Sequence, residues 1–218
     1  MPQGSWAVPC RIKCFSISDE LDSKIFDDID AVINTAGMDT RKPLMKQSPI
    51  EIKSQLDVNL YGVINLTKAA LESFSRKGKG QIMHIGGFAD GSWATPYYTV
   101  DVATRVGMYS FIESINLEID NTDIVVQYFC PQPADTVAEK PYHDLWRRQG
   151  LGIVSKEKIA NDIYKAVVAK KTVTVQGNPI NRFVSTKLKH LFPGLVSQLL
   201  LRPMGRMTMK YIDALRSV

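Results

Sequence analysis

Three short apolar runs constrain the fold most strongly, because each is apolar almost throughout instead of alternating with polar residues. They lie at residues 31–34 (AVIN), 81–85 (QIMHI) and 124–130 (IVVQYFC). Strands with this pattern are buried on both faces, as in parallel sheets that carry helices on both sides. Weaker runs at residues 10–17 and 172–176 fit two further strands.

Helical patterns separate these runs. Ser48 followed by Pro49 is a typical helix start, with a serine N-cap and proline at the first helical position. Apolar residues at helical spacing predict helices over residues 50–74, with a kink near Gly62, and over residues 106–119 and 156–170. The alternation of strands and helices predicts an α/β fold, a Rossmann-like doubly wound parallel sheet.

Length and composition fit one ordinary globular domain. The chain has 218 residues, of which 44% are hydrophobic and 22% charged. We expect a body over residues 1–178 and an extension of the same domain over residues 179–218. No apolar run approaches the roughly 18 residues of a membrane span, so a cytoplasmic protein is expected. Three cysteines and three histidines, at scattered positions, predict neither a disulfide framework nor a metal site.

The basic character belongs to the last 39 residues. Residues 180–218 carry seven Lys and Arg against one Asp, whereas the whole chain has a net charge of +5. Leucines and methionines alternate with these cations, which predicts basic amphipathic helices interrupted at Pro193 and Pro203. Three roles stay open for them: packing on the body or at an oligomer interface, contact with an anionic membrane surface, or contact with a partner protein. The body has no basic surplus, so nucleic-acid binding is not predicted.

Residues 81–107 combine a buried strand, a loop of small and aromatic residues, and the start of a helix. In open α/β sheets the chemistry lies where strand ends meet helix starts. This stretch is therefore the predicted catalytic region.

Several motifs resemble those of the short-chain dehydrogenase/reductase family. Asn34-Thr35-Ala36-Gly37 is similar to the family's N-N-A-G turn, and Asp57-Val58-Asn59-Leu60 to its N-V-N motif. Pro131 and Thr136 match the ends of its P-G-x-x-x-T loop. The resemblance covers residues 10–177. It implies NAD(P) as cofactor, with Asn34, Ala36, Gly37, Pro131 and Thr136 at the cofactor, and Asn59 supporting a proton relay. It also implies a homodimer formed through the two long helices.

The same comparison shows departures from the family. The glycine-rich turn T-G-x-x-x-G-x-G is absent before Gly37, so we expect the sheet to lack its first βαβ portion and to expose a strand edge. We expect that edge to be covered by dimerisation or by residues 3–8, or else the chain to fold poorly. The family's catalytic serine, tyrosine and lysine positions correspond to Gly86 or Gly87, Asp101 and Arg105. Tyr97 and Tyr98 lie near but lack the tyrosine-to-lysine spacing.

These substitutions leave two interpretations of each residue. Asp101, with an ordinary pKa near 4, would be ionised and a poor acid, and the spacing of Asp101 and Arg105 is also that of an exposed helical salt bridge. Asn59 could equally serve as a relay residue or simply bond to neighbouring backbone. We expect a catalytically impaired or inactive family member with a binding or scaffolding role. The alternative is an NAD(P)-dependent oxidoreductase that acts on a carbonyl or alcohol of lipid-like character.

Overall fold

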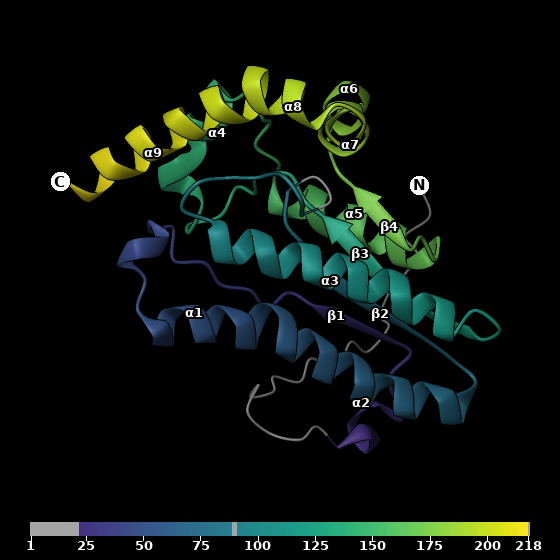
Figure 1. Cartoon of the computed structure of the whole chain (residues 1–218). Coiled ribbons are helices and arrows are strands. Elements are labelled where there is room, and N and C mark those ends of the chain that lie inside the picture. Colours follow the sequence, from purple (N-terminus) through teal and green to yellow (C-terminus); the bar gives the residue numbers. More distant parts are fainter. Residues whose placement is uncertain (1–21, 89–90, 218) are drawn as a thin grey trace.

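The computed structural model describes residues 22–88 and 91–217 (Figure 1). Its four strands form one parallel sheet in the order β1-β2-β3-β4. The strands are β1 (Ala31–Asn34), β2 (Lys79–Ile85), β3 (Asp123–Cys130) and β4 (Val173–Val175). The predicted α/β fold with a Rossmann-like parallel sheet is confirmed. The strand predicted at residues 10–17, and its edge, lie outside the described residues.

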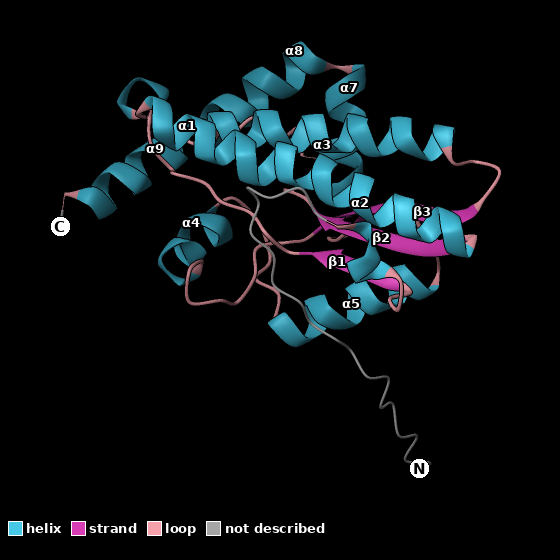
Figure 2. Ribbon diagram, turned by 90° about the horizontal axis from the view of Figure 1, so that it is seen from below, coloured by secondary structure: helices cyan, strands magenta, loops and turns pink. Residues whose placement is uncertain are grey.

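Helices cover both faces of this sheet, as Figure 2 shows from below. The first face carries α1 (Pro49–Leu56), α2 (Gly62–Lys77) and α3 (Thr99–Glu118), and the second carries α5 (Lys156–Val168). Ile82 packs in the core on the α2 and α3 side, whereas its neighbour Met83 packs with Ala166 of α5. Successive strand residues point to opposite faces, so both sets must be apolar, which explains the continuous apolar runs.

The first long helix is not a regular α-helix throughout. Ser48 and Glu51 form a complete capping box at the start of α1. A π-helical turn over Asp57–Tyr61 then joins α1 to α2, immediately before Gly62, where the sequence predicted a kink. Such turns insert an extra residue and often occur at functional sites. Here the turn contains the fully buried Asn59.

The second long helix begins earlier than its apolar stripe indicated. The sequence predicted residues 106–119, but α3 already starts at Thr99. Its first two turns contain Asp101 and Arg105, which belong to the site and interrupt the apolar pattern. The predicted helix at residues 156–170 corresponds to α5, and β4 is shorter than the run at residues 172–176.

The basic tail forms a series of helices that lies along the carboxyl edge of the sheet (Figure 1). Its α-helical segments are α6 (Pro179–Arg182), α7 (Lys189–Leu191), α8 (Pro193–Val196) and α9 (Arg202–Arg216), and π-helical turns cover Phe183–Leu188 and Ser197–Leu201. Val196 and Met204 pack with the buried Trp93 in the loop after β2. Gln149, which follows α4 (His143–Arg148), donates to the Thr208 hydroxyl of α9 at 2.8 Å. Packing on the body therefore accounts for one face of the tail.

Within the described ranges, no helix is long and apolar enough to cross a membrane. Several large apolar side chains of the long helices are exposed, among them Ile50, Tyr61, Ile64 and Val106. The homodimer through these helices stays a prediction.

A buried histidine joins β1, β2 and α2. The Asn34 side-chain amide donates to His84 Nδ1 at 3.1 Å, and Thr67 Oγ1 lies 2.8 Å from His84 Nε2. Because an amide nitrogen only donates, Nδ1 accepts and the proton lies on Nε2. Thr67 in turn donates to the Val63 carbonyl at 2.8 Å. Burial lowers the pKa of His84 to about 3, so the imidazole is neutral in the folded chain.

We predict that His84 makes the fold less stable in acid. The unfolded chain takes up a proton below the ordinary histidine pKa of about 6.5, whereas the folded chain does not until about pH 3. The contribution is complete above pH 6.5 and falls by about 1.4 kcal/mol per pH unit below it. Urea unfolding of the native chain and His84→Gln at pH 7.5 and 5.5 should show a smaller pH effect, by about 1.4 kcal/mol, in the variant. An unchanged pH effect in His84→Gln would contradict the prediction.

Two glycines after β2 shape the turn at the site. A Cβ atom at Gly86 would lie 2.1 Å from Cζ of Tyr128, a fully buried ring of β3. At Gly87 the nearest atom is Cγ of the flexible Arg105 side chain, at 3.2 Å. Of the two positions matched to the family's serine, only Gly87 therefore has room for a side chain.

We predict that alanine at these adjacent positions has unequal effects. Gly86→Ala should lower the free energy of unfolding by about 1–3 kcal/mol or more, because Tyr128 must move within a packed core. Gly87→Ala is the matched control and should cost clearly less. Equal losses in urea unfolding would contradict this account of the turn.

Candidate functional site

The candidate site lies where the carboxyl ends of β1 and β2 meet the first turns of α3. Arg105 Nε donates to Asp101 Oδ1 at 3.1 Å, and the Asn59 amide donates to the same oxygen at 3.1 Å. The side chains of Arg105 and Asp101 are only 12% and 17% exposed. Three of the four residues predicted as catalytic are thus in direct contact, and the fourth, Gly87, packs against Arg105.

The guanidinium of Arg105 reaches from α3 across the ends of two strands. Its Nη1 donates to the Ile85 carbonyl at the end of β2, at 3.0 Å. Its Nη2 lies 2.7 Å from the position that a Cβ atom would take on Gly37, in the turn after β1. Glycine at position 37 therefore leaves space for this cation. The predicted cofactor residue Gly37 has a structural role toward Arg105.

The helical salt bridge that the spacing of Asp101 and Arg105 suggested is present, but the exposed position given to it is wrong. The two side chains do form the expected ion pair of adjacent helical turns, but they are mostly buried. The ordinary pKa expected for Asp101 is also wrong. Burial raises the pKa of Asp101 above its usual range, and the opposing charge and hydrogen bond of Arg105 do not cancel this rise.

Asn59 bonds to neighbouring backbone, which is one of the two interpretations that the sequence left open, and its relay role stays a prediction. Its side chain accepts from the Met38 amide at 2.9 Å and donates to the Met38 carbonyl at 2.8 Å. It therefore fixes the loop after β1 while its amide also reaches Asp101. Asn59 belongs to the π-helical turn and is fully buried.

A small cavity of about 140 Å³ adjoins this network. Asp101 and Arg105 line it together with the aromatic side chains of Trp93, Tyr98 and Trp146. The Tyr98 hydroxyl is buried and has no hydrogen-bond partner within the described part of the chain. Burial raises the pKa of Tyr98, so its hydroxyl stays protonated at neutral pH. The cavity thus offers one proton donor beside an ion pair.

A wider cleft of about 910 Å³ lies on the other side of Arg105. Gly37 and Thr136 line it, as do Thr35 and Ile85. Thr40 and Arg41 are also part of its wall. Their Oγ1 and Nη1 atoms, respectively, are buried without hydrogen-bond partners among the described residues. Unsatisfied buried groups are rare in folded chains, and these two are enclosed by the protein instead of open to the cleft.

The remaining predicted cofactor residues lie at the same edge with different contacts. The Asn34 side chain accepts from the Ala36 amide at 3.0 Å and donates to His84, so its bonds hold the turn. Pro131 directly follows β3 and is not part of the cleft wall. Their binding roles stay predictions.

Sequence reasoning missed a cluster around Arg41. This side chain pairs with Asp39 and Glu139, and its guanidinium lies 4.0 Å from the centre of the Tyr142 ring. Burial alone would lower the pKa of Arg41, but the hydrogen bond that Arg41 donates to Asp39 and the charges around it raise the pKa overall, so the group stays charged. Trp146 Nε1 also donates to Glu139 at 3.0 Å. Only the proximity of Asp39 and Arg41 was visible in the sequence, because the other partners lie about a hundred residues away.

Among the described residues, no group of three or more His, Cys, Asp or Glu side chains could hold a metal ion.

Comparison with known proteins identifies two reductases among the relatives of this chain. The chain is 29% identical to a ketoacyl reductase, HetN, of Nostoc sp., over 73% of this chain and 55% of the relative. It is 32% identical to the 3-oxoacyl-[acyl-carrier-protein] reductase FabG of Haemophilus influenzae, over 65% of this chain and 59% of the relative. The chain spans little more than half the length of the curated relatives it matches.

A solved structure has the same fold. A 4-hydroxyisoleucine dehydrogenase mutant complexed with NADH and succinate aligns with a TM-score of 0.61 at 21% identity, over 69% of this chain and 68% of that one. The model of the family described as short chain dehydrogenase matches residues 13–144, which is more than half of the chain. The chain therefore belongs to the short-chain dehydrogenase family.

Proposed function

We propose that this chain is a short-chain dehydrogenase family member whose centre binds a ligand but transfers hydride poorly or not at all. The observation that supports this most directly is the closed network of Asn59, Asp101, Arg105 and the Ile85 carbonyl. Asp101 and Arg105 occupy the positions that match the family's tyrosine and lysine. Asp101 Oδ1 and the Nε and Nη1 atoms of Arg105 are engaged with each other, with Asn59 and with the backbone.

Carbonyl reduction needs a proton at the oxygen as hydride reaches the carbon, and a well-placed acid contributes about 10²- to 10⁴-fold to the rate. One oxygen of Asp101 already accepts two hydrogen bonds. Protonating this carboxylate would also leave the buried Arg105 cation without its counter-charge, which is costly. Asp101 is thus a poor substitute for a tyrosine acid.

The family implies a nicotinamide dinucleotide as cofactor, and the described residues fit part of such a ligand. The cleft next to Gly37 and Ile85, two residues that Arg105 approaches, has a volume of about 910 Å³, which is large enough for part of a dinucleotide. Thr35, Gly37 and Thr136 would lie along it. When bound, the dinucleotide would supply hydride; this chain would contribute the cleft and the fixed charge of Arg105.

We predict no carbonyl reduction above background by the native chain with NADH or NADPH. A triple variant, Gly87→Ser with Asp101→Tyr and Arg105→Lys, should gain turnover, because it restores an acid and a compact cation. Turnover is measured as loss of nicotinamide absorbance against a panel of ketones and aldehydes, and cofactor binding is measured separately by calorimetry. A triple variant that still binds cofactor but stays inactive would show that more than these three positions limits the chemistry.

The alternative is an active NAD(P)-dependent oxidoreductase, favoured by the protonated Tyr98 hydroxyl in the cavity beside Asp101. This alternative predicts native turnover that Tyr98→Phe lowers by about 10²-fold or more, whereas Asp101→Asn would lower turnover if the carboxyl group itself were the acid. Native activity with either sensitivity would overturn the proposal of an impaired centre.

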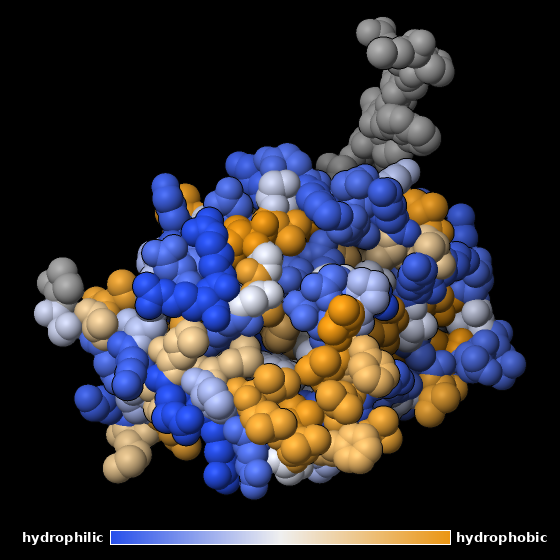
Figure 3. All heavy atoms as spheres, turned by 90° about the horizontal axis from the view of Figure 1, so that it is seen from above, coloured by the Kyte–Doolittle hydropathy of each residue, from blue (hydrophilic) through white to orange (hydrophobic). Residues whose placement is uncertain are grey.

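A second proposal concerns an anionic membrane surface as partner. An outer apolar patch lies on the tail, and each of its side chains is at least half exposed; it comprises Ile180, Phe183, Leu191, Phe192, Leu195 and Leu199. Figure 3 shows apolar side chains gathered on this face. The tail also carries seven cations. Exposed apolar side chains among cations are typical of segments that lie in a membrane interface.

We predict that the full chain pellets with vesicles containing phosphatidylserine and much less with phosphatidylcholine alone. Leu195→Asp combined with Leu199→Asp should lower the bound fraction roughly tenfold, since two apolar contacts with lipid are lost. Leu117→Asp, at an exposed leucine of α3, is the matched control. Equal binding by the double variant and the control would contradict the assignment of the patch.

A further inference from the structure

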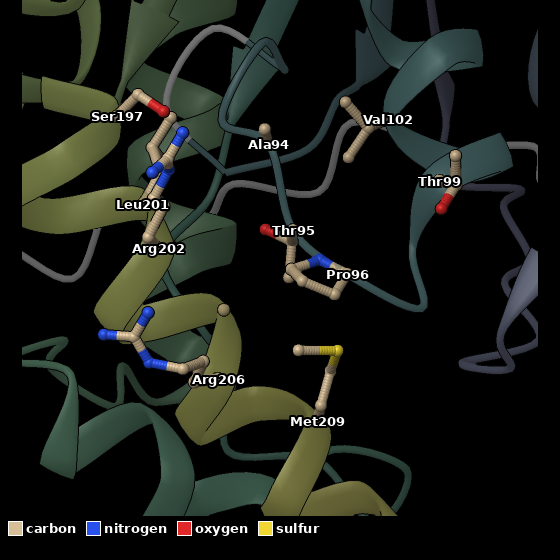
Figure 4. A pocket seen from close by; sticks show the side chains of 11 residues that line it. Ala94, Thr95, Pro96, Thr99, Val102, Ser197, Leu201, Arg202, Arg206 and Met209 are labelled. Atoms are coloured by element: carbon tan, nitrogen blue, oxygen red, sulfur yellow. The ribbon is translucent and has the colours of Figure 1, made fainter. Parts of the chain in front are cut away.

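A pocket of about 510 Å³ lies between α9 and the start of α3, within the size range of small-molecule sites. Figure 4 shows α9 on one side, Thr99 and Val102 of α3 on the other, and the loop of residues 94–96 between them. Pro96, Val102, Leu201 and Met209 give it a mainly apolar wall. Among the described residues, none with an acidic side chain belongs to this wall.

Two arginines of α9 also line the pocket. Arg202 and Arg206 are one helical turn apart, so their side chains lie on the same face of α9. Neither makes an ion pair or a hydrogen bond with any residue that the structure describes. Like charges at this spacing repel each other by a few tenths of a kcal/mol. An anion between them would relieve that repulsion and form charge-assisted hydrogen bonds.

The helix is held close to the pocket by its packing on the loop. A Cβ atom at Gly205 would lie 3.0 Å from Cγ of Pro96, so α9 approaches the loop as nearly as a glycine allows. Tyr97, the next residue, donates to both carboxylate oxygens of Asp213, at 3.1 and 2.9 Å. The wall that carries the arginines is therefore fixed against the body by two separate contacts.

The apolar part of the pocket continues toward the candidate site. Thr95 and Val102 line both this pocket and the small cavity that contains Asp101 and Arg105. An elongated ligand with its charged group at the arginines would therefore direct its apolar end toward that cavity.

We propose that this pocket binds a single-chain anionic amphiphile, with a carboxylate or phosphate head at Arg202 and Arg206 and an alkyl chain along Val102 and Met209. The binding itself does not depend on the proposed loss of hydride transfer; only the direction of the chain toward Asp101 rests on the proposed site. Charge complementarity selects the anionic head, and the apolar wall selects the chain.

The test is calorimetric titration of the full chain, without nicotinamide, with decanoate, decyl phosphate, decanol and inorganic phosphate below micelle formation. We expect decanoate and decyl phosphate to bind, decanol to bind at least tenfold more weakly, and inorganic phosphate not to bind measurably. A preference for the carboxylate or the phosphate then identifies the head group. Equal binding of decanol, or binding of phosphate alone, would overturn the proposal.

Variants separate the pocket from general attraction to a basic tail. Arg202→Gln and Arg206→Gln should each weaken decanoate binding roughly tenfold or more, as expected for a hydrogen bond between charged groups. Lys210→Gln removes an exposed cation of the same helix that does not line the pocket, and should leave affinity unchanged. Ala94→Phe fills the pocket from an exposed loop position and should also weaken binding.

Equal losses of decanoate affinity in Arg206→Gln and Lys210→Gln would overturn the proposal that the head group binds in this pocket. They would favour diffuse electrostatic attraction by the basic tail. Thermal unfolding with and without decanoate provides a second measurement if a variant is poorly folded, since ligand that binds the folded chain raises its melting temperature. Because no cofactor is present, failure here leaves the proposal on hydride transfer untouched, and detected turnover leaves amphiphile binding untouched.

Discussion

The arrangement of side chains at the carboxyl edge of the sheet depends on how the buried cation of Arg105 is paired and hydrogen-bonded. A guanidinium taken out of water must be paired and hydrogen-bonded. Asp101 supplies the counter-charge, and the Ile85 carbonyl supplies an acceptor at the end of β2. Asp101 in turn accepts from Asn59, which a π-helical turn holds against the loop after β1. Glycines at positions 37 and 87 leave room for the arginine side chain.

This chain of dependence explains which parts of the fold could be predicted from the sequence. The strands were predictable because burial on both faces forces a continuous apolar pattern, and this pattern needs no knowledge of distant residues. The start of α3 was not predictable, because its first two turns carry Asp101 and Arg105 at positions where the apolar stripe would continue. These two residues belong to the candidate site. Local periodicity is least informative where the residue type is set by contacts with residues far away in the sequence.

The candidate site, too, could be predicted from the sequence only in part. Motif positions identified Asn59, Asp101 and Arg105, and these residues do meet. Their burial, and the resulting rise in the pKa of Asp101, could not be predicted, because it depends on distant residues such as Trp146 and Leu151, which line the same cavity. The Arg41 cluster was invisible for a similar reason: Glu139 lies in the loop after β3 and Arg216 bonds to the Arg41 carbonyl from the end of α9.

The tail connects the two sites that the structure suggests. Its inner face packs on Trp93, while its outer face exposes leucines to solvent, so its amphipathic pattern alone could not say which face would be buried. The α9 pocket and the cavity at Asp101 share Thr95 and Val102 as wall residues. Two ligands that contact the same side chains influence each other's affinity, and thermodynamics requires this influence to be reciprocal. A ligand at the α9 arginines would therefore change affinity at Asp101 by the same factor as a ligand at Asp101 changes affinity at the arginines.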